Sequence, residues 1–267
     1  MGAALEVVTG SLSAAAVTTA QAFAANSPGS FTVRATNGGS MAHLLNAWGN
    51  LSGAGQLRIR SPRLHDAQQA ISLRAIGSVV QPLIQDGFDQ ELYSQDTLTV
   101  EALFDAAPTA ATEESMGMLV YYDDLGGANA RLRHWAEIAP AIESYYVQEA
   151  LPVTGAAGAW GAGYVINSAY DDWKANRDYA LIGYTTSDAC TAVAISGSDT
   201  GNYYVGGPGP TNPHETRDFF KKLSDNTGKA CIPVINAANK LSTQVYAVSD
   251  AGAATIHVGL IFALLKG

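Results

Sequence analysis

The clearest pattern of hydrophobic and polar positions lies near the end of the chain, in residues 255–265. Every second residue is apolar throughout, and the residues between them become apolar only toward the end. This is typical of a strand with one face in a core and its last part buried on both faces. The apolar set is Ile256, Val258, Leu260, Phe262 and Leu264.

Similar patterns predict strands along most of the chain. Residues 97–104 alternate, whereas residues 116–122 are apolar on both faces, as expected of a central strand. Since sequential strands usually lie side by side, these two are predicted to be antiparallel neighbours. The remaining predicted strands cover residues 31–35, 56–60, 71–80, 142–153, 179–185, 191–195, 203–205, 229–234 and 242–248.

Helices are predicted to be few and short. Met41, Leu44, Leu45 and Trp48 have helical spacing after Ser40, and 131–140 is a second candidate. A third short helix is expected after Asn167 or Ser168. The best start signal is Asn212–Pro213–His214–Glu215, a capping box followed by an apolar stripe and by Gly228 at the expected C′ position. The glycine-rich residues 154–163 are predicted to form a loop.

The predicted class is mainly β. The helices needed between most strands of a parallel sheet are missing, which favours an antiparallel β-sandwich of the jelly-roll kind with short helices in long connections. Residues 1–30 are rich in Ala, Ser, Thr and Gly and are interpreted as an N-terminal arm or extended edge segment, with a simple disordered tail as the alternative. Residues 31–267 then form the sandwich domain.

Composition adds a hypothesis about the surface. Charged residues make up only 15% of the chain, and the net charge is −9. So few charges suggest that much of the surface is covered or built from small residues. The negative charge argues against general attraction to nucleic acid phosphates. No secretory signal or membrane-spanning run is visible, so synthesis in the cytoplasm is expected.

No group of residues in the sequence matches a known catalytic motif. Asp123–Asp124 is interpreted as a turn sequence rather than a metal site, and Asp171–Asp172 as a helix-start pair. The histidines lack metal-ligand spacing, and His257 is predicted to be structural rather than a catalytic base. The five histidines are His43, His65, His134, His214 and His257.

Nucleophile and phosphate-loop signatures are also missing. Ser196–Asp199 lacks the first glycine of a nucleophile elbow, and Gly201–Pro210 lacks the spacing of a phosphate loop, as does Thr227–Lys229. Cys190 and Cys231 lie in apolar runs and are predicted to be buried free thiols. We therefore expect no enzymatic activity, and we assign no catalytic, cofactor-binding or metal-binding residue and no cofactor.

Two groups of side chains are candidates for contact surfaces. Arg58, Arg60 and Arg63 fit the polar face of an edge strand, an intersubunit ion-pair site or, as a third alternative, a nucleic-acid contact. Tyrosines and tryptophans in the loop-rich middle are either ordinary core and rim or a contact surface, for copies of the chain or for sugars. They are Tyr145, Tyr146, Trp160, Tyr164, Tyr170, Trp173, Tyr203 and Tyr204.

The layout resembles the β-sandwich capsid proteins of viruses and bacteriophages. The resemblance is carried by the segment 9–30 before the first strong strand, by the strands TLTVEALF and MGMLVYY, by the long loops and by the terminal strand TIHVGLIFALL. It implies a virion protein that assembles with copies of itself into a shell and contacts other virion proteins. Many such proteins have a basic arm, but residues 1–33 contain no Lys or Arg, so little direct nucleic-acid binding is expected.

The main functional alternative is a carbohydrate-binding or adhesive sandwich on a virion or cell surface. It would use the aromatic loops, whereas an enzyme on the same scaffold is disfavoured by the missing catalytic residues. A shell-building fold with a long spine helix is the rival architecture, and no helical pattern in the sequence is long enough for its spine.

Overall fold

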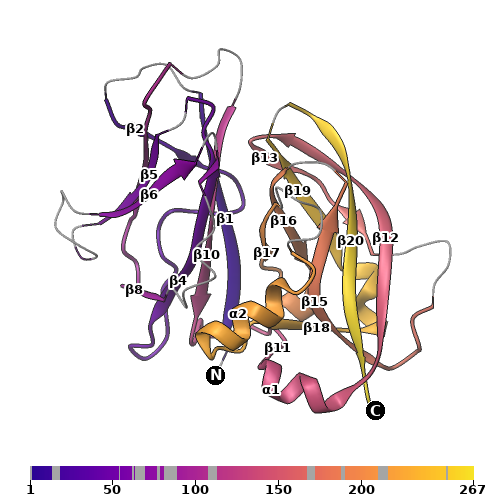
Figure 1. Cartoon of the computed structure of the whole chain (residues 1–267). Helices are drawn as coiled ribbons and strands as arrows, with labels where there is room; N and C mark the ends of the chain where they lie inside the picture. Colours follow the sequence, from indigo (N-terminus) through magenta and orange to yellow (C-terminus); the bar gives the residue numbers. More distant parts are fainter. Residues whose placement is uncertain are drawn as a thin grey trace.

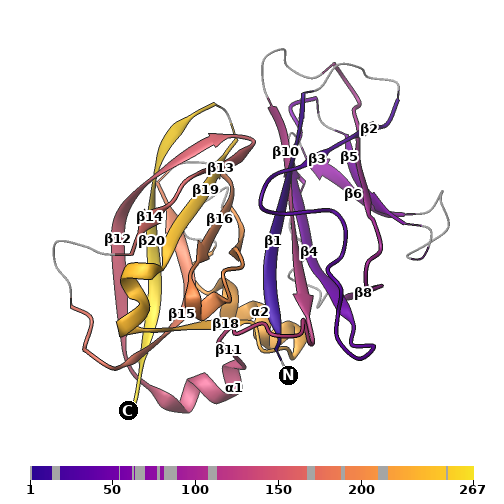
Figure 2. The ribbon, with the colours of Figure 1, turned by 180° about the vertical axis from the view of Figure 1, so that it is seen from behind.

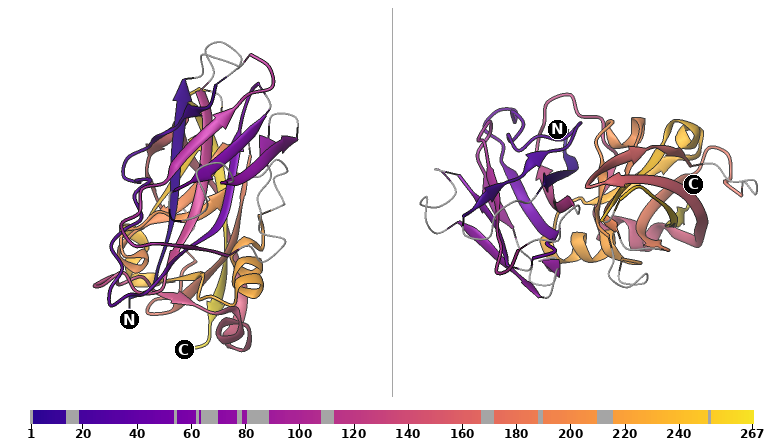
Figure 3. Two further views of the ribbon diagram at one scale, coloured as in Figure 1. Left: turned by 90° about the vertical axis from the view of Figure 1, so that its left-hand side faces the viewer. Right: turned by 90° about the horizontal axis from the view of Figure 1, so that it is seen from above.

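The computed structural model confirms a mainly β protein with antiparallel sheets and few, short helices (Figure 1). It describes residues 2–13, 19–53, 55–61, 63, 70–76, 79–80, 89–107, 113–166, 172–187, 190–209, 216–250 and 252–267. The strands form two sheets, one from each half of the chain. We call them the N-terminal unit, built from β1 to β10, and the C-terminal unit, built from β11 to β20. From above, the two units lie side by side (Figure 3).

The N-terminal unit is a sheet that closes on itself. Its path begins at β2, which pairs with β9, and ends at β3, which pairs with β1. β2 and β3 are separated only by Phe23, so one short segment joins the two ends of the sheet. The strands are β1 (Ala4–Ser13), β2 (Gln21–Ala22), β3 (Ala24–Ala25), β4 (Ala42–Asn50), β5 (Gln56–Arg60), β6 (Ile71–Ile76), β7 (Val79–Val80), β8 (Gln90–Leu92), β9 (Thr99–Leu103) and β10 (Glu113–Tyr122).

The C-terminal unit is a curled, half-barrel sheet that stays open (Figure 2). The C-terminal strand β20 lies between β12 and β15, and its five alternating apolar residues are buried as predicted. The pairing of β12 with β19 is parallel. The strands are β11 (Leu132–Arg133), β12 (Ile142–Ala157), β13 (Ala159–Ala162), β14 (Tyr164–Val165), β15 (Asp178–Thr186), β16 (Cys190–Ser196), β17 (Val205–Pro208), β18 (Ile232–Asn236), β19 (Gln244–Ser249) and β20 (Ala254–Leu265).

The helical segments all belong to the C-terminal half. They are α1 (Trp135–Ile138), the 3-10 turns η2 (Ala139–Ala141), η3 (Ser198–Thr200) and η4 (Ala237–Ser242), and α2 (Phe219–Thr227). α2 buries Phe219, Phe220 and Leu223, which is the predicted stripe, and Gly228 ends it with φ +66°. The predicted capping box at 212–215 and the predicted helix start at 167–168 lie outside the described residues.

The predicted helix at 41–48 is wrong, because this segment is strand β4. β4 has a hydrophobic core on each side: Leu44 packs in the core of the N-terminal unit, whereas Leu45 and Trp48 pack in the core of the C-terminal unit. A strand buried on both faces has apolar residues at odd and even positions. A helical spacing then appears by coincidence.

The N-terminal segment differs from the predicted arm. β1 pairs with β10 over its whole length and with β3 at Gly10 and Ser11, so it lies inside the sheet. Small residues serve close packing here: a Cβ at Gly10 would lie 2.7 Å from the ring of Phe31. The small side chains that suggested an arm therefore allow the chain to fit under its neighbours.

Three further predictions about strands are wrong. Residues 154–163 form the β12–β13 hairpin instead of a loop, and its glycines permit close approach: a Cβ at Gly161 would lie 1.5 Å from the carbonyl oxygen of Thr154. Residues 31–35 contribute only an isolated bridge between Thr32 and Thr97. β9 pairs with β5 and β2, not with β10, which lies between β1 and β4.

Strands of the N-terminal unit contribute side chains to the core of the C-terminal unit. Trp48 of the N-terminal unit, 3% exposed, packs among residues of the C-terminal unit and donates from Nε1 to the carbonyl oxygen of Thr191 at 2.7 Å. Ser115 Oγ and Thr191 Oγ1 are 2.6 Å apart, and Val7 N donates to the carbonyl oxygen of Tyr204. Gly117 leaves room for the indole, because a Cβ there would lie 2.4 Å from it.

Candidate functional site

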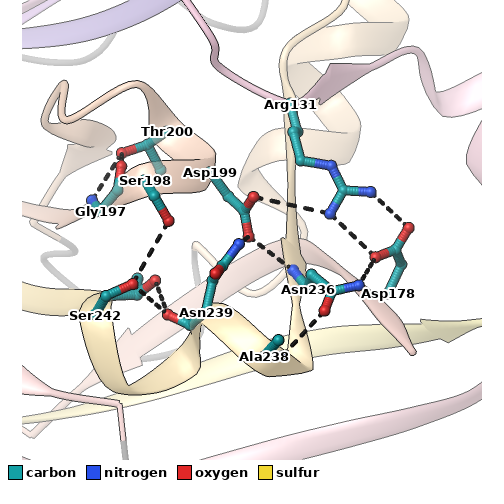
Figure 4. Close-up of polar contacts among 11 residues, drawn as sticks. Arg131, Asp178, Gly197, Ser198, Asp199, Thr200, Asn236, Ala238, Asn239 and Ser242 are labelled. Carbon is teal, nitrogen blue, oxygen red and sulfur yellow. Dashed lines mark hydrogen bonds and ion pairs between the residues drawn. The ribbon is translucent and has the colours of Figure 1, made fainter. Parts of the chain in front are cut away.

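The densest polar cluster joins five segments of the C-terminal unit (Figure 4). Arg131, just before β11, forms a bidentate pair with Asp178 at the start of β15, with N–O distances of 3.0 and 2.6 Å. Asn236, at the end of β18, donates from Nδ2 to Asp178 and from its backbone N to Asp199 in η3. Asn239 in η4 also donates to Asp199, at 3.0 Å.

The pKa shifts in this cluster come from ion pairs and hydrogen bonds that hold these segments of the chain together. Burial disfavours the charged form of Asp178, but the bonds from Arg131 and Asn236 outweigh it and lower the pKa of this carboxyl. The bond to Asp178 in turn raises the pKa of Arg131. Asp199 is only 6% exposed and its Oδ2 accepts two hydrogen bonds. The carboxylates are therefore occupied by groups of the chain itself.

The serines beside this cluster have no catalytic environment. Ser198 Oγ lies 3.5 Å from Ser242 Oγ, and none of the described hydrogen bonds in Figure 4 brings a histidine to either hydroxyl. Thr200 Oγ1 instead closes the turn by accepting from Gly197 N at 2.9 Å. The missing nucleophile elbow in the sequence agrees with this geometry.

Asp123 and Asp124, which follow β10, make different contacts. Asp124 accepts from the backbone N of Gly126 and of Gly2, and these bonds lower its pKa. This is the turn that the sequence predicted. Asp123 points elsewhere and meets His43 Nε2 at 3.0 Å. Asp172 is exposed, and Asp171 lies outside the described residues.

His43 is the centre of a second polar cluster, which no sequence pattern indicated. Its Nδ1 lies 2.7 Å from Asp89 Oδ1, and the other oxygen of Asp89 lies 3.2 Å from Lys229 Nζ. The contacting pairs are 46, 80 and 140 residues apart in the sequence, so no spacing rule applies, and only the topology brings them together. Among the described residues, no group of His, Cys, Asp and Glu is arranged to hold a metal ion.

The other two histidines that the structure describes, His134 and His257, do not converge with acids. His257 is exposed on β20, and its backbone N donates to Ser187 Oγ. His134 precedes α1 without a side-chain cap bond. His65 and His214 lie outside the described residues. Cys190 and Cys231 are buried free thiols as predicted, and burial raises the pKa of Cys231 to about 12.

The arginine cluster is used inside the N-terminal unit. Arg58 and Arg60 on β5 both bind the carboxylate of Glu101 on the neighbouring strand β9, at 2.7 and 2.8 Å. These bonds lower the pKa of Glu101, with the bond from Arg60 contributing most. Arg63 lies 5.8 Å from the ring centroid of Tyr93. The first interpretation was the polar face of an edge strand: the alternation of β5 is confirmed, but its edge position is wrong, because β5 pairs with β6 on one side and with β9 on the other.

Most of the described candidate aromatic residues are buried or partly buried against other rings. Trp173 packs against Tyr146, Tyr179 and Phe262 in the C-terminal unit. Trp160, Tyr204 and Tyr246 stack in sequence with centroid distances of 5.0 and 4.5 Å. Tyr145 and Tyr164 are exposed, at 62% and 37%, and Tyr170 lies outside the described residues. The glycine-rich stretch after Gly201 forms the buried strand β17 up to Pro208.

Comparisons with family models, curated proteins and solved structures give no match to this chain. In the described part of the chain, no helix has the length and hydrophobicity needed to cross a membrane.

Proposed function

We propose that this protein is a structural, self-assembling subunit, a virus or bacteriophage coat protein whose copies form a shell. The proposal includes copies of itself and other virion proteins as partners, the virion as its place of action, and no enzymatic role. The resemblance in layout suggests it, and the use of charge in the structure supports it.

The observation that carries the proposal is that most of the positive side chains pair with carboxylates of the same chain. Eleven of the 15 Lys and Arg residues form ion pairs with its own carboxylates. Charged residues make up only 15% of the chain, so much of its surface consists of small and neutral groups that lose little solvation when they meet a copy of the chain. The eleven are Arg34, Arg58, Arg60, Arg74, Arg131, Arg133, Lys174, Arg177, Lys221, Lys222 and Lys229.

Exposed apolar side chains give a second line of support. Tyr145 and Val147 are 62% and 47% exposed and lie two residues apart on β12, so they share one face of that strand. β12 lies on the side of the C-terminal unit that faces away from the N-terminal unit (Figures 1 and 2). A pair of this kind suits contact with a neighbouring copy.

The same ion pairs bear on nucleic acid. Arg58 and Arg60 share the Glu101 carboxylate, which leaves a modest local positive charge within a chain of net charge −9. Direct binding of genome phosphates is therefore expected to be weak. Mixing the full chain with single- and double-stranded nucleic acid at physiological salt should give no stable complex.

Electron microscopy of the purified full chain tests the assembly proposal. Closed or regular particles, or defined capsomers, are expected. A glycan-binding module is the alternative, and it would stay small and change its tryptophan fluorescence when glycans are added. The internal packing of Trp160 and Trp173 supports assembly over that alternative, because these rings are not displayed as a platform.

A further inference from the structure

The cluster around His43 lies where the two units meet. His43 is on β4, directly between Glu91 on β8 and Tyr121 on β10 in the register of the sheet. Its side chain is 10% exposed. Lys229 enters from the C-terminal unit, just after α2, and its Nζ lies 5.3 Å from the ring centroid of Tyr121. The contact between His43 and Lys229 runs through Asp89, which bonds to both.

The two carboxylate acceptors around His43 determine which of its ring nitrogens must carry protons. Both ring nitrogens of His43 face carboxylate oxygens, Nδ1 at 2.7 Å and Nε2 at 3.0 Å. Ionised carboxylates only accept hydrogen bonds, and a neutral imidazole has a single N–H to donate. Only the imidazolium form satisfies Asp89 and Asp123 together.

The arrangement excludes a metal ion held by this set. The two ring nitrogens point in opposite directions, so Asp89 and Asp123 lie on opposite sides of the ring. One ion cannot contact both carboxylates and the same imidazole. The ring instead bridges the carboxylates as a double donor.

The balance of charge depends on one proton. With the ring protonated, two cations, His43 and Lys229, face two carboxylates, Asp89 and Asp123. With the ring neutral, the cluster has an excess negative charge, and a nitrogen lone pair faces a carboxylate oxygen at hydrogen-bond distance. That contact is repulsive, and the ring that makes it is shielded from water, with its side chain only 10% exposed.

We propose that His43 is a proton-dependent clasp that fastens the N-terminal unit to the C-terminal unit through Asp89 and Lys229. Protonation closes the clasp and loss of the proton loosens it. The contribution to stability is therefore present at lower pH and is lost as pH rises through the titration of the ring, within about pH 5 to 8. This inference does not depend on the proposed function.

The neighbouring titratable groups leave His43 as the switch in this range. Burial is the main reason why the pKa of Tyr121 lies above its usual value, and burial likewise raises the pKa of Cys231 to about 12, so both stay neutral. Glu91, the register partner of His43, has an exposed side chain. Its carboxylate adds negative charge beside the ring and so favours the protonated form.

The test compares urea unfolding of the full chain between about pH 5 and 8 for the wild type, His43→Gln and His257→Gln. His257→Gln is the matched control, because His257 is exposed and none of the described contacts brings a carboxylate to its ring. At the acid end we expect the wild type and the control to exceed His43→Gln by about tenfold in the folding equilibrium constant, the worth of one charge-assisted hydrogen bond. That advantage should shrink toward the alkaline end.

Parallel pH profiles for the wild type and His43→Gln would overturn the proposal, as would an advantage that grows with pH. If His43→Gln does not fold, the protonation state of His43 can be measured directly in the wild type. The ¹⁵N chemical shifts of His43 in the wild type at the acid end should report protons on both nitrogens, and a single neutral tautomer there would contradict the clasp. Asp123→Asn, at a side chain that is 44% exposed, should move the midpoint of the pH profile to lower pH.

Discussion

The N-terminal and C-terminal units are both ten-stranded in the described residues, but one closes on itself and the other stays open. The N-terminal unit joins its two sheet ends through the segment that contains β2 and β3. The C-terminal unit ends at β11 and β17 and fills its concave side with α2 and with the indole of Trp48. The open unit therefore needs the closed one to complete its core, whereas the N-terminal unit also has a core of its own.

This difference indicates where substitutions should reduce the stability of each unit most. The N-terminal unit encloses a core built from its own strands, so its own interior largely decides its stability. An open sheet depends on what covers it, and here that cover is partly β1, β4 and β10 of the other unit. Changes at the shared face should therefore cost more than changes at the outer surfaces.

The largest effect is expected from Trp48→Ala, which removes the side chain that the N-terminal unit inserts into the other core. The loss of burial, the cavity and the loss of the hydrogen bond from the indole to the Thr191 carbonyl should lower the free energy of unfolding by about 3–5 kcal/mol. Urea denaturation measures it. Trp135→Ala, at a half-buried tryptophan on α1, is the control and should cost clearly less; equal costs would show that the shared face is not special.

Gly117→Ala should come next, at about 1–3 kcal/mol, because the new methyl group would overlap the indole of Trp48. A double-mutant cycle with Trp48→Leu separates this clash from other effects. If the clash is the cause, Gly117→Ala costs much less in the Trp48→Leu background. Additive costs would exclude it.

Glu101→Gln tests the interior charge of the closed unit. It leaves Arg58 and Arg60 without their carboxylate and should cost about 1.5–3 kcal/mol near neutral pH. The pKa of Glu101 is lowered in the folded protein, so its contribution is present above its unfolded value of about 4.3 and is lost as pH falls through the folded value. The variant should lack that acid-side loss, and urea midpoints measured at falling pH show whether it does.

Glu143→Gln is the matching change on the open unit and should have a smaller effect. Lys174 and then Arg177 lower the pKa of Glu143 to about 2, but its side chain is 37% exposed and water screens both pairs. Urea denaturation of the two variants, measured side by side near neutral pH, compares the units directly. A loss as large as that of Glu101→Gln would mean that burial does not decide the worth of these ion pairs.

The smallest effect on stability is expected from the double substitution Tyr145→Lys and Val147→Lys. Both side chains are exposed on β12, so the free energy of unfolding should change by no more than about 0.5 kcal/mol per site. If copies meet at this face, two lysines should nevertheless reduce assembly strongly. Light scattering of the variant beside the wild type measures this, and unchanged assembly would place the contact elsewhere.

Much of the fold was predictable because the strands follow local patterns. β9 and β20 alternate, and β10 is apolar on both faces, so each was recognisable without tertiary information. β4 was missed because it packs between two cores, and the β12–β13 hairpin was missed because its glycines serve close packing instead of a loop. Local patterns also do not determine which strands pair, as β9 and β10 show.

The polar clusters were less predictable than the fold. The turn at Asp124 and the position of Arg58 on the polar face of β5 follow from neighbouring residues in the sequence. The clasp of His43, Asp89, Asp123 and Lys229 does not, since its members come from separate strands and loops of both units. The sequence around each of these residues is ordinary, and they come together only in the folded protein.

The central claim is that this chain works by assembling with copies of itself. The molar mass of the purified full chain, measured by light scattering across a range of concentrations, tests it most directly. The account predicts species of many times the 27.8 kDa of one chain. A species of one chain at every concentration would contradict it.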